Sequence, residues 1–232
     1  MSVSRLCLAV SLLAPTLLVF TAPAAEAAPK HAAKPVPVKT VSVPASVVPA
    51  EPGMLPDMAL GSPNAPVTVV EYASASCPHC AAWNAESWPT FRDKYVVTGK
   101  VRYVFRELLT SPAEYALTGF LIGRCAVAKS KAPGNSAPYF AVVNAFFQSQ
   151  ANYYKDGDMG PVEAQVTKLT GLSQMTQLDC VTDDKQIDAF YKTMNAHAEA
   201  DKITGTPTFI VNGKRVEGHE LKDIDAAIAA AH

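Results

Sequence analysis

Short apolar runs and amphipathic stretches alternate along the chain, and together they predict a mixed α/β domain. Residues 65–74 place branched apolar side chains between prolines, which is typical of a short buried strand. Residues 100–108 alternate Val and aromatic side chains with arginines and predict a second strand. Residues 77–96, between these strands, predict a helix that Pro89 should kink or break.

The middle of the chain has the spacing of helices, and the strand pattern returns near the end. The helical stretches cover residues 112–130, 137–150, 161–169 and 184–202. Residues 206–218 then predict a hairpin through Asn212-Gly213, a pair that favours tight turns. Residues 220–232 close the chain as an amphipathic helix.

The predicted order is therefore β–α–β, a helical block, and β–β–α. A β–α–β unit implies two parallel strands with a right-handed crossover. This order predicts the fold class α/β, a thioredoxin-like fold with an inserted helical domain. We expect the first half of that fold over residues 57–110, the helical insertion over 111–202 and the second half over 203–232.

The first 56 residues have a different composition and predict export. Arg5 precedes an apolar run over residues 6–20, and small residues follow at the spacing of a signal-peptidase site near Ala27 or Ala28. We therefore expect a cleaved signal peptide over 1–28 and an exported protein; an uncleaved membrane anchor is the alternative. Residues 29–56 carry seven prolines, which predicts a disordered tether without helix or strand.

Charge and cysteine content argue against a nucleic-acid-binding protein and permit disulfide bonds. The formal net charge is −1 and 49% of the residues are hydrophobic, so one globular domain is expected and no basic surface points to nucleic acid. Removal of the signal peptide with Cys7 leaves four cysteines, an even number that an oxidising compartment can pair. They are Cys77, Cys80, Cys125 and Cys180.

The stretch Cys77-Pro78-His79-Cys80 is the main candidate for chemistry. It places Cys77 at a predicted helix N-terminus, with Ser76 as the expected capping residue, where unpaired N–H groups and the helix dipole favour a thiolate. Cys80 lies one turn further and suits the role of resolving thiol, while His79 can lower the pKa of Cys77. Stabilising the thiolate stabilises the reduced form, which predicts an oxidising site.

Other interpretations of this motif are weaker. The chain has no second pair of cysteines or histidines at the spacing of a zinc site, so no metal is expected. Ala81 follows Cys80, which excludes the haem-attachment pattern. A purely structural disulfide within the motif remains an alternative.

A second candidate site lies at Thr206-Pro207, directly before strand residues. A proline there is explained by a cis peptide bond in a tight turn that presents the Thr206 backbone to an extended peptide. The alternative is an ordinary trans proline at the start of a strand.

The motif around Cys77, the pair Thr206-Pro207 and the helical insert between them together resemble the DsbA-like family of thiol–disulfide oxidoreductases, over roughly residues 57–231. The resemblance implies that Cys77 is the nucleophile, Cys80 the resolving thiol and Pro207 a cis proline. It implies redox-tuning roles for Pro78, His79 and Glu71. Glu71 matches a buried acid of the family that serves as a proton relay or balances charge. A strand-end surface glutamate is the alternative, and Thr206 stands where the best-known oxidase has valine.

The resemblance also implies partners and a direction of electron flow. We expect a periplasmic, monomeric oxidase that donates the Cys77–Cys80 disulfide to reduced exported proteins and is reoxidised by a membrane quinone-linked thiol oxidase. No cofactor beyond the redox-active disulfide is expected. An isomerase or reductase of the same fold is one alternative, and a non-catalytic module that binds peptides or a metal is another.

Cys125 and Cys180 lie within the expected helical insertion, away from the motif. We interpret them as a second, structural disulfide; two buried free thiols are the alternative. We expect Cys180 to lie in a connection between helices, and Trp83, Trp88 and Phe91 to be core and site-rim residues, with a hydrophobic peptide groove as a sharper hypothesis.

Overall fold

The computed structural model describes residues 43–231. The signal peptide expected over 1–28 and the part of the tether over 29–42 lie outside the described residues, so both stay predictions.

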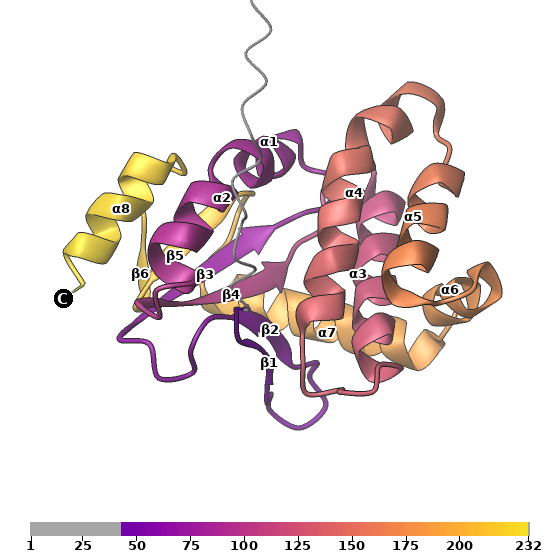
Figure 1. The fold of residues 1–232 in the computed structure, drawn as a ribbon, viewed down its shortest axis with the longest axis horizontal. Helices are drawn as coiled ribbons and strands as arrows, with labels where there is room; N and C mark the ends of the chain where they lie inside the picture. Colours follow the sequence, from indigo (N-terminus) through magenta and orange to yellow (C-terminus); the bar gives the residue numbers. More distant parts are fainter. Residues whose placement is uncertain (1–42, 232) are drawn as a thin grey trace, which may run out of the picture. The chain divides into compact units, whose positions relative to one another are not determined.

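A six-stranded mixed sheet forms the centre of the molecule, with the strand order β1-β2-β4-β3-β5-β6 (Figure 1). Only β3 and β4 pair in parallel, as the β–α–β order requires; every other neighbouring pair is antiparallel. The strands are β1 (Ala45–Val48), β2 (Asp57–Leu60), β3 (Val67–Ala73), β4 (Val101–Glu107), β5 (Thr208–Val211) and β6 (Lys214–Arg215).

Helices flank the sheet, and Figure 1 shows α3 to α6 grouped on one side of it while α7 passes behind it. The helices are α1 (Pro78–Glu86), α2 (Trp88–Phe91), α3 (Ala113–Ala128), α4 (Ala137–Asp156), α5 (Gly160–Thr170), α6 (Gln174–Val181), α7 (Asp184–Ala200) and α8 (Leu221–Ala229). A π-helical turn, Arg92–Val96, continues α2. The helix predicted after Cys77 is interrupted at Ser87, two residues before Pro89, because the ring of a proline cannot fit inside a helix.

The two faces of the sheet have different roles, since neighbouring side chains of a strand point to opposite faces. On β3, Glu71 lies on the face covered by α1. Tyr72 lies on the other face, where its hydroxyl donates to a carboxylate oxygen of Asp201, 2.5 Å away, beyond the end of α7. Arg106 of β4 joins the same group through ion pairs to Asp201 and Asp57.

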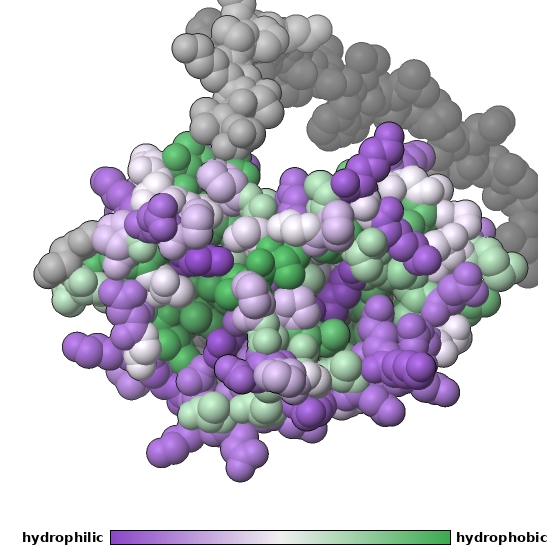
Figure 2. Space-filling view, turned by 90° about the horizontal axis from the view of Figure 1, so that it is seen from below, coloured by the Kyte–Doolittle hydropathy of each residue, from purple (hydrophilic) through white to green (hydrophobic). Residues whose placement is uncertain are grey.

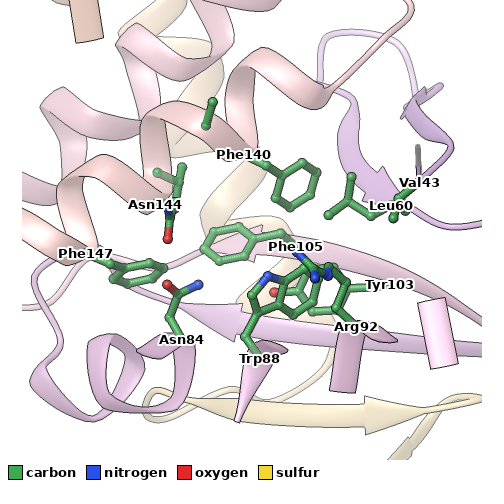
Figure 3. Close-up of a pocket in the computed structure, with 12 residues that line it drawn as sticks. Val43, Leu60, Asn84, Trp88, Arg92, Tyr103, Phe105, Phe140, Asn144 and Phe147 are labelled. Carbon is green, nitrogen blue, oxygen red and sulfur yellow. The ribbon is translucent and has the colours of Figure 1, made fainter. Parts of the chain in front are cut away.

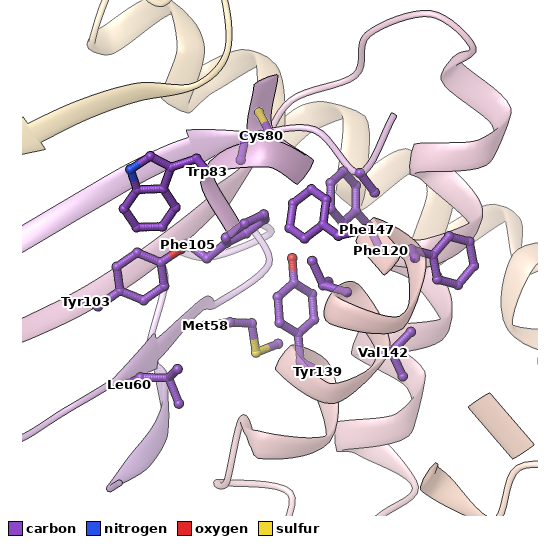
Figure 4. Close-up of a cluster of buried hydrophobic side chains, with 14 of the residues drawn as sticks. Met58, Leu60, Cys80, Trp83, Tyr103, Phe105, Phe120, Tyr139, Val142 and Phe147 are labelled. Carbon is purple, nitrogen blue, oxygen red and sulfur yellow. The ribbon is translucent and has the colours of Figure 1, made fainter. Parts of the chain in front are cut away.

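The core lies between β4 and the helices α1, α3 and α4. Figure 4 shows Phe105 between the aromatic rings of the sheet side and those of the insertion. Its ring centroid lies 6.0 Å from that of Phe120 and 5.9 Å from that of Tyr139. Because these contacts join β4 to α3 and α4, the helical insertion and the sheet share one hydrophobic core.

The tether predicted over 29–56 is wrong in its described part. Residues 45–48 form β1, which pairs with β2, and Val47 and Leu55 pack against the core. Pro44 and Pro49 flank this strand closely, so its sequence lacks the alternating run that indicates a strand. All four residues of β1 are half-buried. Figure 2, which looks onto this end of the molecule, shows apolar surface toward the middle and hydrophilic side chains along the margins.

Cys180 belongs to a helix, α6, and not to a connection as predicted. The Ser173 hydroxyl caps this helix by accepting a hydrogen bond from the Thr176 N–H. Eight residues are too few for the apolar spacing to stand out in the sequence.

Candidate functional site

The Cys77 backbone stands at the junction of β3 and α1. Pro78 occupies the first turn of α1, where a missing N–H leaves no hydrogen bond unmade. The residue before a proline is confined to extended backbone angles, and Cys77 has φ −81° and ψ 119°. Cys77 is therefore the N-terminal capping residue, and the prediction of Ser76 for that position is wrong.

Ser76 instead anchors the loop that precedes the helix. Its hydroxyl lies 2.8 Å from the Thr110 carbonyl oxygen and 3.0 Å from the hydroxyl of Ser74. Both serine side chains are fully buried. The N–H of Cys77 donates to the Ser74 carbonyl at 3.0 Å, so the chain makes a tight turn just before the reactive thiol.

The environment of the Cys77 sulfur favours its thiolate. A hydrogen bond from the Cys80 thiol lowers the pKa of Cys77 most strongly; burial opposes it, and Thr206 and the N–H groups of Cys80 and His79 lower the pKa further, to about 5. Two of these N–H groups belong to the first turn of α1, whose amides have no partner within the helix. The thiol of Cys77 is therefore largely ionised at neutral pH.

Cys80 is the opposite case. Its side chain has no exposed surface, whereas Cys77 keeps 6% exposure. Burial is the largest cause that raises the pKa of Cys80 well above the ordinary thiol value, and the contact with Cys77 and the charge of Glu71 raise it further. The pair thus consists of one reachable thiolate and one enclosed thiol that holds its proton.

Glu71 lies beneath the cysteine pair on β3 and is 2% exposed, so the surface alternative is wrong. Burial raises its pKa from 4.5 to about 8, against a hydrogen bond from Tyr103 that lowers it. The Tyr103 hydroxyl donates to the Glu71 carboxylate at 2.5 Å. At neutral pH the carboxyl group of Glu71 therefore carries a proton next to an enclosed thiol.

The Thr206–Pro207 peptide bond is cis. The Thr206 backbone lies beside the Cys77 sulfur. The Sγ of Cys77 lies 3.4 Å from the Thr206 carbonyl oxygen. The β5 strand begins directly after Pro207 and pairs with β3, so the two segments that carry the motifs are hydrogen-bonded neighbours in the sheet.

His79 lines a shallow hollow of about 330 Å³ between α1 and α8. Its ring centroid lies 6.2 Å from that of His219, which stands just before α8. Trp83 and Leu221 also line this hollow. Of the three aromatics predicted for the core and rim, Trp83 and Phe91 are buried and Trp88 is half-buried.

Trp88 lines a second, separate groove between the α1–α2 segment and α4 (Figure 3). This groove lies on the face of the sheet that also carries Glu71. The groove has a volume of about 260 Å³ and a floor formed by Tyr103 and Phe105. Figure 3 shows Asn84 and Asn144 extending toward one another from opposite sides of it. Since the Tyr103 hydroxyl contacts Glu71, one residue connects this groove with the buried acid.

Two residues near the pair were missed in the sequence. Gln150 and Tyr154 of α4 donate hydrogen bonds to backbone carbonyls of the loop before α1. The apolar spacing ended the predicted helix at residue 150, whereas α4 continues to Asp156, so Tyr154 fell outside it. The one available signal was a glutamine on an otherwise apolar helix face.

Cys125 of α3 and Cys180 of α6 form a disulfide, with an S–S distance of 2.01 Å. Both residues are buried within the helical insertion. This bond connects elements that are 55 residues apart in the chain.

Among residues 43–231, no cluster of three or more His, Cys, Asp or Glu side chains has the arrangement needed to bind a metal ion. In the same range, no helix has the combination of length and apolar character needed to cross a membrane.

Comparisons with known proteins agree with this geometry. The family model described as thioredoxin matches residues 54–230. A protein of Rickettsia typhi, named as a candidate protein-disulfide oxidoreductase, is 30% identical over 175 residues, which cover 75% of this chain and 62% of that protein. The chain thus spans about three fifths of the length of this curated relative.

Solved structures show the same architecture. The crystal structure of Wolbachia pipientis alpha-DsbA1 superposes with a TM-score of 0.64 at 26% identity, covering 79% of this chain and 92% of that one. The Chlamydia trachomatis DsbA structure gives 0.63 at 14% identity, covering 80% and 96%. The predicted fold class, α/β and thioredoxin-like with an inserted helical domain, is confirmed.

Proposed function

The chain belongs to the thioredoxin family, in its DsbA-like branch, and from this premise we propose that it is a protein thiol:disulfide oxidase acting on exported proteins. One observation carries the proposal. A stabilised thiolate at the N-terminus of α1 stands beside an enclosed thiol that keeps its proton, and the Thr206 backbone is next to the thiolate. This arrangement favours the reduced form of the pair and so favours taking electrons from a substrate.

The oxidised enzyme holds a Cys77–Cys80 disulfide. A substrate thiolate attacks the Sγ of Cys77, forming a mixed disulfide and breaking the bond to Cys80, which leaves with the electron pair. Glu71 carries a proton at neutral pH and lies close enough to interact with Cys80, so it supplies that proton directly or through a water molecule. The high pKa of Cys80 makes the uptake of this proton favourable.

A second substrate thiolate then attacks the substrate sulfur of the mixed disulfide. The substrate disulfide forms, and Cys77 leaves as a thiolate stabilised by the N–H groups of α1. Two electrons have moved from the substrate to the enzyme. A membrane quinone-linked thiol oxidase would accept these electrons and restore the Cys77–Cys80 disulfide.

The position of the Thr206 backbone supports a binding role toward extended peptides. The Thr206 backbone is next to the Cys77 sulfur, so a substrate strand paired with it would bring its cysteine within reach. We propose that reduced, unfolded exported proteins are the substrates and that the monomer acts in the periplasm after removal of residues 1–28.

The equilibrium redox potential of the Cys77–Cys80 pair tests the direction. It is measured against glutathione on a Cys125→Ala/Cys180→Ala background, so that only one pair titrates. A potential clearly above about −180 mV supports a dithiol oxidase, and one near about −270 mV indicates a reductant. Cys77→Ser must abolish oxidation of a reduced test protein; wild-type turnover in that variant would reject the mechanism, and no turnover by the wild type would favour a non-catalytic module.

A further inference from the structure

Three successive carbonyl groups of the loop before α1 accept hydrogen bonds from side chains of α4. The Gln150 side-chain amide donates to the carbonyl oxygens of Ala75 at 2.7 Å and Cys77 at 3.2 Å. The Tyr154 hydroxyl donates to the carbonyl oxygen between them, that of Ser76, at 2.5 Å. We call Gln150 and Tyr154 the α4 clamp.

The two clamp residues are four positions apart, so they lie on one face of α4, one turn from each other. Gln150 is 5% exposed, and water has little access to the carbonyls that it binds. Tyr154 is 47% exposed, and its hydroxyl also lies 3.2 Å from the Ser111 carbonyl oxygen. The clamp therefore combines an enclosed contact with one at the surface.

These contacts bear on the thiolate because they occupy the negative ends of three peptide dipoles at and just before Cys77. A carbonyl oxygen turned toward the sulfur would repel the negative charge of the thiolate. A hydrogen-bond donor on that oxygen keeps the carbonyl turned away from the sulfur and offsets the partial negative charge of the oxygen. The Tyr154 hydroxyl is within reach of the sulfur's field: burial raises the pKa of Tyr154, and the charge of Cys77 raises it further.

We propose that the α4 clamp is a positioning device for the redox pair. By holding the three loop carbonyls, it keeps the start of α1 oriented so that the helix N–H groups stabilise the Cys77 thiolate. The helical insertion thereby sets the redox potential of a site that belongs to the other part of the fold. This inference rests on the proposed function, because it concerns the same dithiol.

Tyr154→Phe tests the clamp with the smallest change, since it removes one hydroxyl from a half-exposed side chain. Gln150→Met and the double variant extend the test to the buried contact. Tyr153→Phe is the matched control: Tyr153 neighbours Tyr154 on α4, but its hydroxyl lies 3.4 Å from Glu114 and does not reach the loop. Each protein is titrated with glutathione, and the thiolate absorbance of Cys77 is followed against pH.

One neutral hydrogen bond corresponds to about a fivefold change in an equilibrium constant. We expect Tyr154→Phe to lower the equilibrium constant for reduction of the Cys77–Cys80 pair by glutathione about fivefold. The double variant should lower it at least about tenfold, which is roughly 30 mV toward a weaker oxidant. The pH at which half of Cys77 is ionised should rise in Tyr154→Phe and rise further in the double variant. Tyr153→Phe should match the wild type in both measurements.

Wild-type equilibrium constants and thiolate midpoints in both Tyr154→Phe and the double variant would overturn the inference. If the clamp only stabilised the fold, its loss would lower the stability of the oxidised and reduced forms equally and leave the redox potential unchanged. That result would also contradict the inference. If Gln150→Met fails to fold, Tyr154→Phe decides. A wild-type potential near that of a reductant would reject the oxidase proposal, whereas the clamp is judged on the difference between variant and wild type.

Discussion

The carboxyl group of Glu71 is enclosed beneath the cysteine pair. The substitution Glu71→Gln measures how much the burial of this ionisable group lowers the free energy of unfolding. In the native protein, burial raises the pKa of Glu71 from 4.5 to about 8, and in the unfolded chain the pKa returns to the ordinary value. Between these two pH values the folded state keeps a proton that the unfolded state has released. The free energy of unfolding therefore falls by about 1.4 kcal/mol for each pH unit in this interval.

The glutamine side chain cannot ionise, so the variant lacks this pH-dependent loss of stability. Relative to the wild type, Glu71→Gln should have little effect through this term near pH 4.5. By the linkage relation, its free energy of unfolding should be higher by about 3 kcal/mol at pH 7 and about 4 kcal/mol at pH 8, approaching about 5 kcal/mol at higher pH. The Tyr103 hydroxyl can still donate to the glutamine oxygen, which keeps the local packing comparable.

The assay is urea unfolding of the two proteins with the Cys77–Cys80 pair reduced, the form to which the raised pKa of Glu71 belongs. Unfolding curves are compared at several pH values from 4.5 to 8.5. Glu86→Gln is the matched control, because Glu86 belongs to α1 and is exposed. It should give no difference that grows with pH. A Glu71→Gln difference that stays constant over this range would refute the assignment of a raised pKa to Glu71.

Two further predictions concern the stability of the insertion. Cys125→Ala/Cys180→Ala should lower the free energy of unfolding by about 4 kcal/mol, the chain-entropy value for a 55-residue loop, without moving the redox potential of the Cys77–Cys80 pair; unchanged stability in guanidinium unfolding would contradict this. Arg124→Met should cost about 3–5 kcal/mol in the same assay, because it leaves Glu107, its 6%-exposed partner at 2.7 Å, as an unpaired buried charge. A loss below about 1 kcal/mol would show that this ion pair contributes little.

The reactive centre was predictable because its signals are local. A strand, a helix start and two cysteines occupy about a dozen consecutive residues. The neighbours of Pro207 left cis and trans bonds open, and the family resemblance favoured cis. The proton-holding state of Glu71, by contrast, follows from burial under α1 and from Tyr103 on another strand. The sequence suggested Glu71 only through the family resemblance.

The elements that escaped prediction depend on partners far along the chain. The β1 strand has prolines close to both ends and becomes a strand through its pairing with β2, which in turn pairs with β4. The α4 clamp is a similar case, since a glutamine and a tyrosine near the end of a helix carry no sign of the carbonyls they meet. Ser76 was misassigned because its hydroxyl binds Thr110 rather than capping α1.

The two edges of the sheet have a consequence for the proposed substrates, which are reduced, unfolded proteins. An open strand edge can recruit a client's backbone and seed co-aggregation, and the two edge strands here are poor templates for it. The β6 strand is two residues long and presents Lys214 and Arg215, both exposed. Pro44 and Pro49 stop β1 from lengthening in either direction. If the proposed function holds, an unfolded substrate would therefore meet a pairing site at the turn beside Cys77 and poor pairing sites at both sheet edges.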